Sequence, residues 1–182
     1  IDFQRFVDAG GYRDPQYWTQ PFVKDGRELA FEEAMTLLRD STGRPGPMGW
    51  ELGHYPDGQA EWPVAGVSWY EAMAYAQFAG RSLPSAHHWM HAAAHDLHAD
   101  VLNFGNFGGA GPVAVATREA LSLYGNHDLA GNVAEWVATG SIDRRLTLGG
   151  HFGSPAYLYA DLDGADPWTR RAEIGFRCAL LE

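Results

Sequence analysis

The chain has 182 residues, enough for one compact domain covering residues 1–182, and a formal net charge of −10. Binding to a phosphate backbone needs clustered lysine and arginine, so the acidic balance and the lack of a basic run predict no nucleic-acid partner. No apolar stretch is long enough for a bilayer-spanning helix, and no signal peptide is visible. Cys178 is the single cysteine, so no internal disulfide indicates the redox compartment, and the cellular compartment stays open.

The first third of the chain predicts two helices followed by a long loop. Phe3, Phe6 and Val7 share one face of a short amphipathic helix that stops at a pair of glycines. Residues 28–40, "ELAFEEAMTLLRD", predict a second helix. Glycines and prolines then break all periodicity over residues 41–63, which predicts a loop.

Residues 67–80, "VSWYEAMAYAQFAG", give the clearest helix signal. Ser68 can accept a hydrogen bond from a backbone N–H of the first turn while Glu71 reaches back to the N–H of Ser68, the capping-box arrangement. Gly80 follows the last apolar position and predicts the end of the helix.

The remainder predicts one more helix, a loop and two strands. The helix begins near Ser85 and turns Trp89 inward. Residues 103–112 are glycine-rich and predict a loop, whereas 144–152 and 174–181 are typical of strands. Short helices followed by loops and a few strands indicate an α+β domain.

Four stretches in a fixed order carry a family resemblance. They are "PVAGVSWYEAMAYAQFAGRSLPSAHHW", "YGNHDLAGNVAEW", "LGGHF" and "GFRCA". Together they resemble the formylglycine-generating-enzyme (sulfatase-modifying factor) superfamily, and the resemblance covers about the whole chain. It implies a C-type-lectin-like α+β fold with much irregular structure.

Two further stretches resemble a branch of this family found beside bacterial serine/threonine kinase domains. They are "FVDAGGYRDPQYW" and "GRPGP". The resemblance implies a kinase domain as a possible neighbour in the full-length protein. The family usually has an N-terminal hairpin ahead of the position of Ile1, so we expect these strands to be missing from this chain or supplied by a second chain.

The resemblance also bears on catalysis. The oxidising members bind copper(I) through two cysteines that follow a "GGS" strand, and soft thiolates suit that metal. Aligned through Gly149-Gly150, these positions are Ser154 and Tyr159 in this chain. Since neither is a thiol, we expect no copper-dependent oxidation. The leading prediction is a non-catalytic recognition or regulatory domain.

Two other functions stay open. A sister branch of the family forms carbon–sulfur bonds with histidine-bound iron, and here His88, His91, His95 and His98 follow helical spacing. An oxygen-dependent metalloenzyme using His91, His95 and His151 is one alternative, against a plain polar helix face. The other is a variable binding protein that diversifies its loops on this fold.

The stretch "YGNHDLAGNVAEW" predicts a calcium loop. Calcium takes several oxygen ligands, and two carboxylates with two backbone carbonyls can converge where the chain turns. The candidates, which match a calcium site of the family, are Asp128, Gly131, Val133 and Glu135. The alternative is a structural turn in which Glu135 pairs with an arginine and Trp136 fills the core. Asn106 and Phe107 match part of a second family calcium site.

The segment that replaces the family's catalytic loop predicts a ligand surface. It contains a cluster of acids, Asp161, Asp163 and Asp166, which also suits a solvated loop. Aromatic side chains among polar groups suit recognition of a ligand or a protein. We expect a surface that favours a cationic partner, formed by Ser154, Tyr157, Tyr159 and Trp168.

Overall fold

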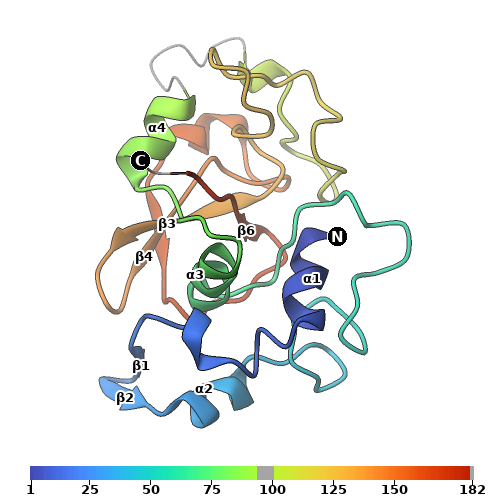
Figure 1. Ribbon diagram of the computed structural model, residues 1–182. Helices are drawn as coiled ribbons and strands as arrows, with labels where there is room; N and C mark the ends of the chain where they lie inside the picture. Colours follow the sequence, from blue (N-terminus) through green and yellow to red (C-terminus); the bar gives the residue numbers. More distant parts are fainter. Residues whose placement is uncertain (94–100, 181–182) are drawn as a thin grey trace.

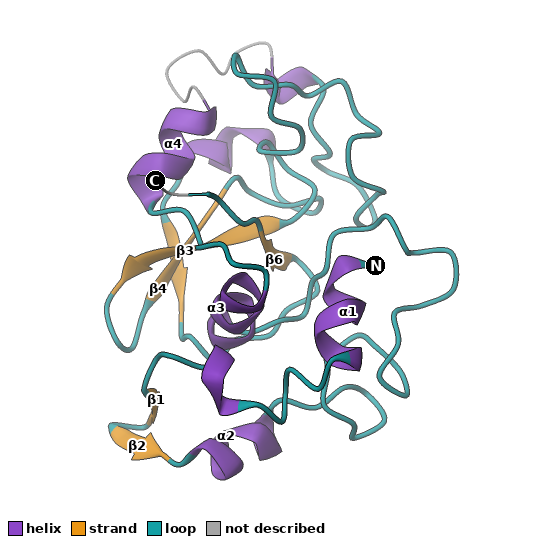
Figure 2. Cartoon of the chain, in the orientation of Figure 1, coloured by secondary structure: helices purple, strands orange, loops and turns teal. Residues whose placement is uncertain are grey.

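The computed structural model describes residues 1–93 and 101–180, and Figure 1 shows the chain from its N-terminus to its C-terminus. The helices are α1 (Asp2–Asp8), α2 (Phe31–Leu37), α3 (Trp69–Phe78) and α4 (Ala86–Ala93), with short 3-10 helices η1 (Pro15–Tyr17), η3 (Val101–Asn103) and η4 (Ala156–Ala160). The strands are β1 (Phe22–Lys24), β2 (Arg27–Leu29), β3 (Ala134–Gly140), β4 (Arg145–Leu148), β5 (Asp163–Ala165) and β6 (Ile174–Phe176). Long loops connect these elements (Figure 2).

The main sheet has four strands in the order β5-β4-β3-β6. Its outer partner β6 runs parallel to β3, and the other two pairs are antiparallel. Helix α3 packs on β3, where the indole Nε1 of Trp69 donates to the Val137 carbonyl at 3.0 Å and Arg145 lies 3.8 Å from the Trp69 ring centre. Helix α4 packs on β3 and β4.

The capping box of α3 is confirmed. The Ser68 hydroxyl accepts from the Glu71 N–H at 3.2 Å, and the Glu71 carboxylate accepts from the Ser68 N–H at 2.7 Å. Gly80 lies beyond the helix end with a φ of 63°, a left-handed conformation that costs glycine little.

The predicted helix over residues 28–40 is wrong in its first turn. Arg27–Leu29 pairs with β1 as a two-residue-turn hairpin, and α2 begins only at Phe31. Asp25 and Gly26 both have positive φ, 51° and 75°, which is the turn conformation that joins two antiparallel strands directly. The turn and the buried contacts of Leu29 outweigh the helical spacing of the apolar residues.

Two clusters of buried side chains form the core. The larger contains the aromatic residues of α1, η1 and α3 together with Trp136, which is fully buried. The smaller lies beneath α4 and contains Trp89, Leu129 and Tyr159. The predicted burial of Trp89 and Trp136 is therefore confirmed. Within the described parts of the chain, no helix is long and apolar enough to cross a bilayer.

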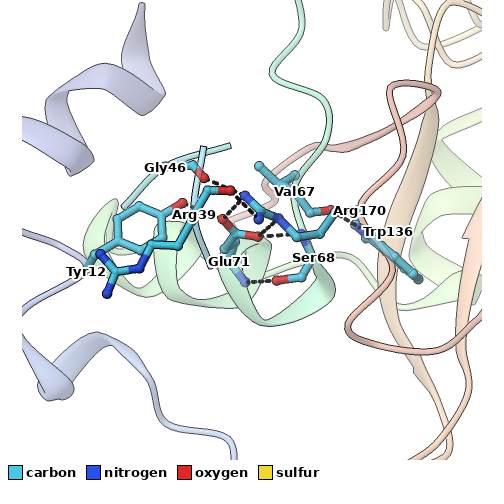
Figure 3. A network of polar contacts seen from close by, with 8 residues as sticks. All are labelled: Tyr12, Arg39, Gly46, Val67, Ser68, Glu71, Trp136 and Arg170. Carbon is cyan, nitrogen blue, oxygen red and sulfur yellow. Dashed lines mark hydrogen bonds and ion pairs between the residues drawn. The ribbon is translucent and has the colours of Figure 1, made fainter. Parts of the chain in front are cut away.

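A buried ion pair joins α3 to two loops (Figure 3). Glu71 is fully buried, and its carboxylate accepts from the Tyr12 hydroxyl at 2.5 Å and contacts the Arg170 Nε at 3.1 Å. Burial is the main cause that raises the pKa of Tyr12 well above its usual value, and the charge of Glu71 adds to it. The hydroxyl therefore stays a hydrogen-bond donor at neutral pH.

Arg170 extends this network into the loop after α2. Its guanidinium donates to the carbonyl oxygens of Arg39 at 2.7 Å and Gly46 at 2.5 Å (Figure 3). Nearby, the indole of Trp136 donates to the Val67 carbonyl at 3.0 Å. The capping glutamate of α3 thus joins chain segments that are far apart in sequence, because one oxygen accepts from Tyr12 and both oxygens contact Arg170.

Candidate functional site

A pocket of about 390 Å³ lies beside β4, between the turn that follows this strand and the segment from η4 to β5. We call it the β4 pocket. It is lined by Ala134, Thr147, Gly150, His151, Ser154, Leu158, Asp161, Leu162 and Asp163. Its lining contains two carboxylates, and in the described chain no lysine or arginine is among its lining residues. The pocket therefore presents negative charge and hydrogen-bonding groups around a small apolar floor.

The turn that shapes the β4 pocket depends on two glycines. Gly149 and Gly150 have φ values of 94° and 65°. A Cβ on Gly149 would lie 2.7 Å from the Leu129 carbonyl oxygen and 3.0 Å from the Trp89 ring. Only glycine fits this close approach, so "LGG" is needed to bring the following residues over the end of β4.

Ser154 closes the same turn. Its hydroxyl accepts from the His151 N–H at 2.9 Å and lies 2.9 Å from the His151 carbonyl, to which it can donate. The ring Nδ1 of His151 accepts from the Gly153 N–H at 3.1 Å, so among the described residues Nε2 is the ring nitrogen without a hydrogen-bond partner. Ser154 and His151 thus lie together at the wall of the β4 pocket, and a ligand-binding role for Ser154 stays a prediction.

The expected aromatic surface is wrong in part. Tyr157 is 77% exposed, but Tyr159 is only 1% exposed and packs with its ring centre 6.1 Å from that of Trp89. Trp168 is half-buried, donates to the Val23 carbonyl at 2.6 Å and lies 4.6 Å from the Tyr70 ring centre. Tyr159 and Trp168 therefore pack against the core. The residues next to them in the sequence do not indicate this burial.

Of the acidic cluster, Asp161 and Asp163 line the β4 pocket and Asp166 does not. Asp166 instead accepts from the Trp168 N–H at 2.7 Å, a local turn contact. Thr147 and Leu158 also line the pocket, and sequence analysis did not single them out. The alternation of β4 gives a weak signal for Thr147, since every second side chain of a strand shares a face.

Glu135 in the predicted calcium loop lies on β3 and pairs with an arginine. One carboxylate oxygen accepts from the Arg177 Nε and from the Trp89 indole, both at 2.6 Å, and the other accepts from an Arg177 Nη at 2.7 Å. Glu135 is 4% exposed. Burial raises the pKa of Tyr159 to about 12, and the Glu135 charge adds to this shift. Pairing with arginine is thus the arrangement found for this side chain.

Asp128 begins the same loop and has a φ of 57°. Its carboxylate accepts from the Ala116 N–H at 2.7 Å. The pKa of the Arg177 guanidinium is raised above its usual value. Burial acts to lower this pKa, but the charge of Glu135, the hydrogen bonds from Arg177 to Glu135 and the charge of Asp128 outweigh burial. Arg177 therefore offsets the repulsion between the two carboxylates. Calcium at Asp128, Gly131, Val133 and Glu135 stays a prediction.

The second predicted calcium position lies against the first loop. Asn106 is buried, and its carbonyl accepts from the Asn132 N–H at 3.0 Å while its side-chain amide donates to the Asn132 side chain at 3.2 Å. Phe107 is half-buried and packs on the smaller core cluster. A metal role for Asn106 and Phe107 stays a prediction as well.

The histidine stripe is only partly described. His88 and His91 are exposed on α4, and the His91 ring centre lies 5.2 Å from that of Tyr124. His95 and His98 lie outside the described residues. Within residues 1–93 and 101–180, no group of three or more histidine, cysteine or acidic side chains is placed to hold a metal.

The mixed sheet, its two packed helices and the long loops define an α+β domain of the C-type-lectin-like class. Two solved structures share the fold. Treponema denticola variable protein 1 has a TM-score of 0.58 at 19% identity, over 81% of this chain and 79% of that chain. CarF has a TM-score of 0.56 at 19% identity, over 68% of this chain and 70% of that chain.

The chain belongs to the sulfatase-modifying factor enzyme 1-like domain family, whose model matches residues 1–181. Hercynine oxygenase from Mycolicibacterium smegmatis is 29% identical over 153 residues, covering 76% of this chain but 34% of that protein. Inactive C-alpha-formylglycine-generating enzyme 2 from Bos taurus is 28% identical over 98% of this chain and 73% of its own length. Serine/threonine-protein kinase pkn1 from Chlamydia pneumoniae is 37% identical over 43% of this chain and 14% of its length.

Proposed function

We propose that this chain is a non-catalytic recognition domain that binds a cationic group in the β4 pocket. The observation that carries the proposal is the charge of this pocket: Asp161 and Asp163 line it, and its described lining contains no basic side chain apart from His151. Opposite charge attracts a cation to such a pocket and favours it over anions. The net charge of −10 strengthens this attraction over longer distances.

The side chains at the family's copper positions support a role without oxidation. The Ser154 hydroxyl closes the turn of the β4 pocket, and the Tyr159 hydroxyl has a pKa raised to about 12. Burial also raises the pKa of the Cys178 thiol to about 11, so this side chain stays protonated at neutral pH. None of the three supplies the thiolate that copper(I) prefers. The similarity to an inactive relative from Bos taurus supports the same conclusion.

The proposal is tested by calorimetric titration with a short lysine-rich peptide and a glutamate-rich peptide of equal length. We expect the lysine-rich peptide to bind and its affinity to fall as salt is raised. Asp161→Asn with Asp163→Asn should weaken binding by roughly three- to tenfold. Asp57→Asn, in an exposed loop outside this pocket, is the matched control and should leave binding unchanged. Equal binding of both peptides, or binding unaffected by the double substitution, contradicts the proposal.

A second assay tests the absence of oxidation. Incubating the protein with copper and a cysteine-containing sulfatase peptide should give no more aldehyde than a protein-free control, because no thiolate is available at positions 154 and 159. A variant with cysteine at both positions shows whether the scaffold itself permits the reaction. Aldehyde formed by the unaltered chain contradicts the proposal.

A regulatory role beside a kinase domain is part of this proposal, supported by the similarity to pkn1. The other candidate is a histidine-dependent oxygenase, supported by the similarity to hercynine oxygenase and by His151 in the β4 pocket. Elemental analysis of the purified protein separates the two. Stoichiometric iron that is lost on His151→Ala supports the oxygenase, and its absence supports the recognition domain.

A further inference from the structure

A second pocket, of about 300 Å³, lies between α1, the loop over residues 50–64 and the end of β6. Figure 1 shows this loop curving around the N-terminal end of α1. We call it the aromatic pocket, because six aromatic side chains are among its lining residues: Phe3, Trp50, Tyr55, Trp62, Tyr75 and Phe176. It shares no lining residue with the β4 pocket.

Most of these rings are held in place by other rings. Phe3 stacks on Tyr75 with ring centres 5.2 Å apart and meets the edge of Phe176 at 6.1 Å. Trp50 meets Tyr55 edge to face at 5.7 Å. These contacts fix the wall of the aromatic pocket before any ligand arrives, which lowers the entropy lost on binding.

Trp62 differs from the other five. It is half-buried at the aromatic pocket, and within the described chain it has no aromatic partner. A tryptophan face carries the strongest negative potential of any side-chain ring and attracts cations. Trp62 therefore adds to the pocket lining a ring that no other described ring contacts.

Charged groups of both signs line the aromatic pocket, and most of them have partners. Asp2 and Glu61 are among its lining residues. Asp2 pairs with Arg5 at 3.0 Å, whereas Glu61 has no ion-pair partner in the described chain. Arg177 also lines the pocket, but its guanidinium is paired with both oxygens of Glu135 at 2.6 and 2.7 Å. The Cys178 thiol is neutral because burial raises its pKa to about 11. Ile1 lines the pocket as well, and its N-terminal ammonium donates to the Ala60 carbonyl at 2.6 Å. Attraction of a cation at this site therefore depends on Glu61 and on the ring of Trp62, because the other charged groups that line it have partners.

We propose that the aromatic pocket binds a quaternary ammonium group of the choline or betaine type. A quaternary ammonium has no N–H donor that needs an acceptor, so moving it from water into contact with aromatic rings leaves no hydrogen bond unmade. A primary ammonium would instead need acceptors for three donors. The same headgroup occurs on free small molecules and on trimethylated lysine, and the pocket recognises the chemistry that these share.

The test is a titration of the whole chain with choline, in which binding is monitored through the indole N–H signals in ¹H–¹⁵N spectra. The signal of Trp62 is assigned with Trp62→Phe. The control ligand is 3,3-dimethylbutan-1-ol, which has nearly the same shape without the charge. We expect choline to shift the Trp62 signal saturably and to bind roughly tenfold more tightly than the neutral alcohol.

Three variants decide the result. Trp62→Leu keeps an apolar side chain but removes the ring, and it should weaken choline binding by roughly tenfold without unfolding the domain. Glu61→Gln should weaken it less, and the exposed Tyr157→Ala should leave it unchanged. Equal binding of choline and the alcohol, no choline binding, or a Trp62→Leu variant that binds as well as the unaltered chain each overturns the proposal.

Two further arms identify the source of the ligand and separate this site from the β4 pocket. Tighter binding of a trimethyl-lysine peptide than of choline assigns the site to methylated protein, and the reverse assigns it to a free metabolite. Asp161→Asn with Asp163→Asn should leave choline binding intact. Choline binding lost in that double variant shows that the cation occupies the β4 pocket and overturns the assignment to the aromatic pocket.

Discussion

Replacing Arg170 with methionine is expected to lower the free energy of unfolding by about 3–5 kcal/mol. The side chain of Glu71 is fully buried, so the substitution leaves a carboxylate without its cation and away from water. It also removes the hydrogen bonds from the guanidinium to the Arg39 and Gly46 carbonyls. The change in the free energy of unfolding is measured by urea denaturation, with circular dichroism as the signal.

The matched control is Arg27→Met, which removes the partner of Glu33 in an exposed ion pair. Water and salt screen that pair, so the control should leave the urea midpoint nearly unchanged. Glu71→Gln combined with Arg170→Met should recover part of the lost stability, because no buried charge is then left without a partner. If Arg170→Met costs no more than Arg27→Met, the buried pair in Figure 3 is not what joins α3 to the loops.

Replacing Glu135 with glutamine is expected to cost about 2–4 kcal/mol, whether or not calcium is present. Arg177 loses the carboxylate that binds its Nε and Nη, and the Trp89 indole loses a charged acceptor. Thermal and urea unfolding of Glu135→Gln are compared with those of the unaltered chain in chelator and in millimolar calcium. A cost that appears only with calcium present would show that this carboxylate acts as a metal ligand rather than as the partner of Arg177.

Asp128 supplies the matched variant for the calcium prediction. If calcium binds the loop, chelator lowers the melting temperature of the unaltered chain, because a ligand that binds only the native state stabilises it. Asp128→Ala should remove this calcium dependence, since within the described residues the Asp128 carboxylate accepts one hydrogen bond, from the Ala116 N–H through one oxygen. A melting temperature of the unaltered chain that chelator leaves unchanged contradicts calcium binding.

If the β4 and aromatic pockets both bind cations, the domain has two sites with different selectivity. The β4 pocket attracts by carboxylate charge and should weaken steeply with salt. The aromatic pocket attracts through ring faces and burial, which salt screens less. Titrations at two ionic strengths therefore distinguish the sites even before any variant is made.

The sequence by itself determined the features that depend on neighbouring residues. The spacing of Ser68 and Glu71 determined the start of α3, because a capping box is made within one helical turn. The pattern over residues 144–152, in contrast, predicts a strand through Gly149-Gly150, whereas β4 ends at Leu148 and the two glycines turn the chain. The close approach of Gly149 to Leu129 and Trp89, which only glycine fits, comes from remote residues.

Only the tertiary structure decided the features that depend on distant partners. Residues 134–140 form a strand because β4 and β6 pair with it from either side, and nothing within the stretch itself requires this. The partners of Glu135 are Arg177, 42 positions away, and Trp89, 46 positions away. Local spacing cannot distinguish such a partner from a metal, because both satisfy the same carboxylate.

The same reason explains the tyrosines of the predicted ligand surface. Tyr157 and Tyr159 are two residues apart and alike in the sequence, yet one is 77% exposed and the other 1% exposed. Their difference is set by η4, which turns Tyr159 toward Trp89 on α4, an element contributed by a remote part of the chain. The sequence determined which side chains were present at this surface, and packing against α4 decided which of them a ligand can reach.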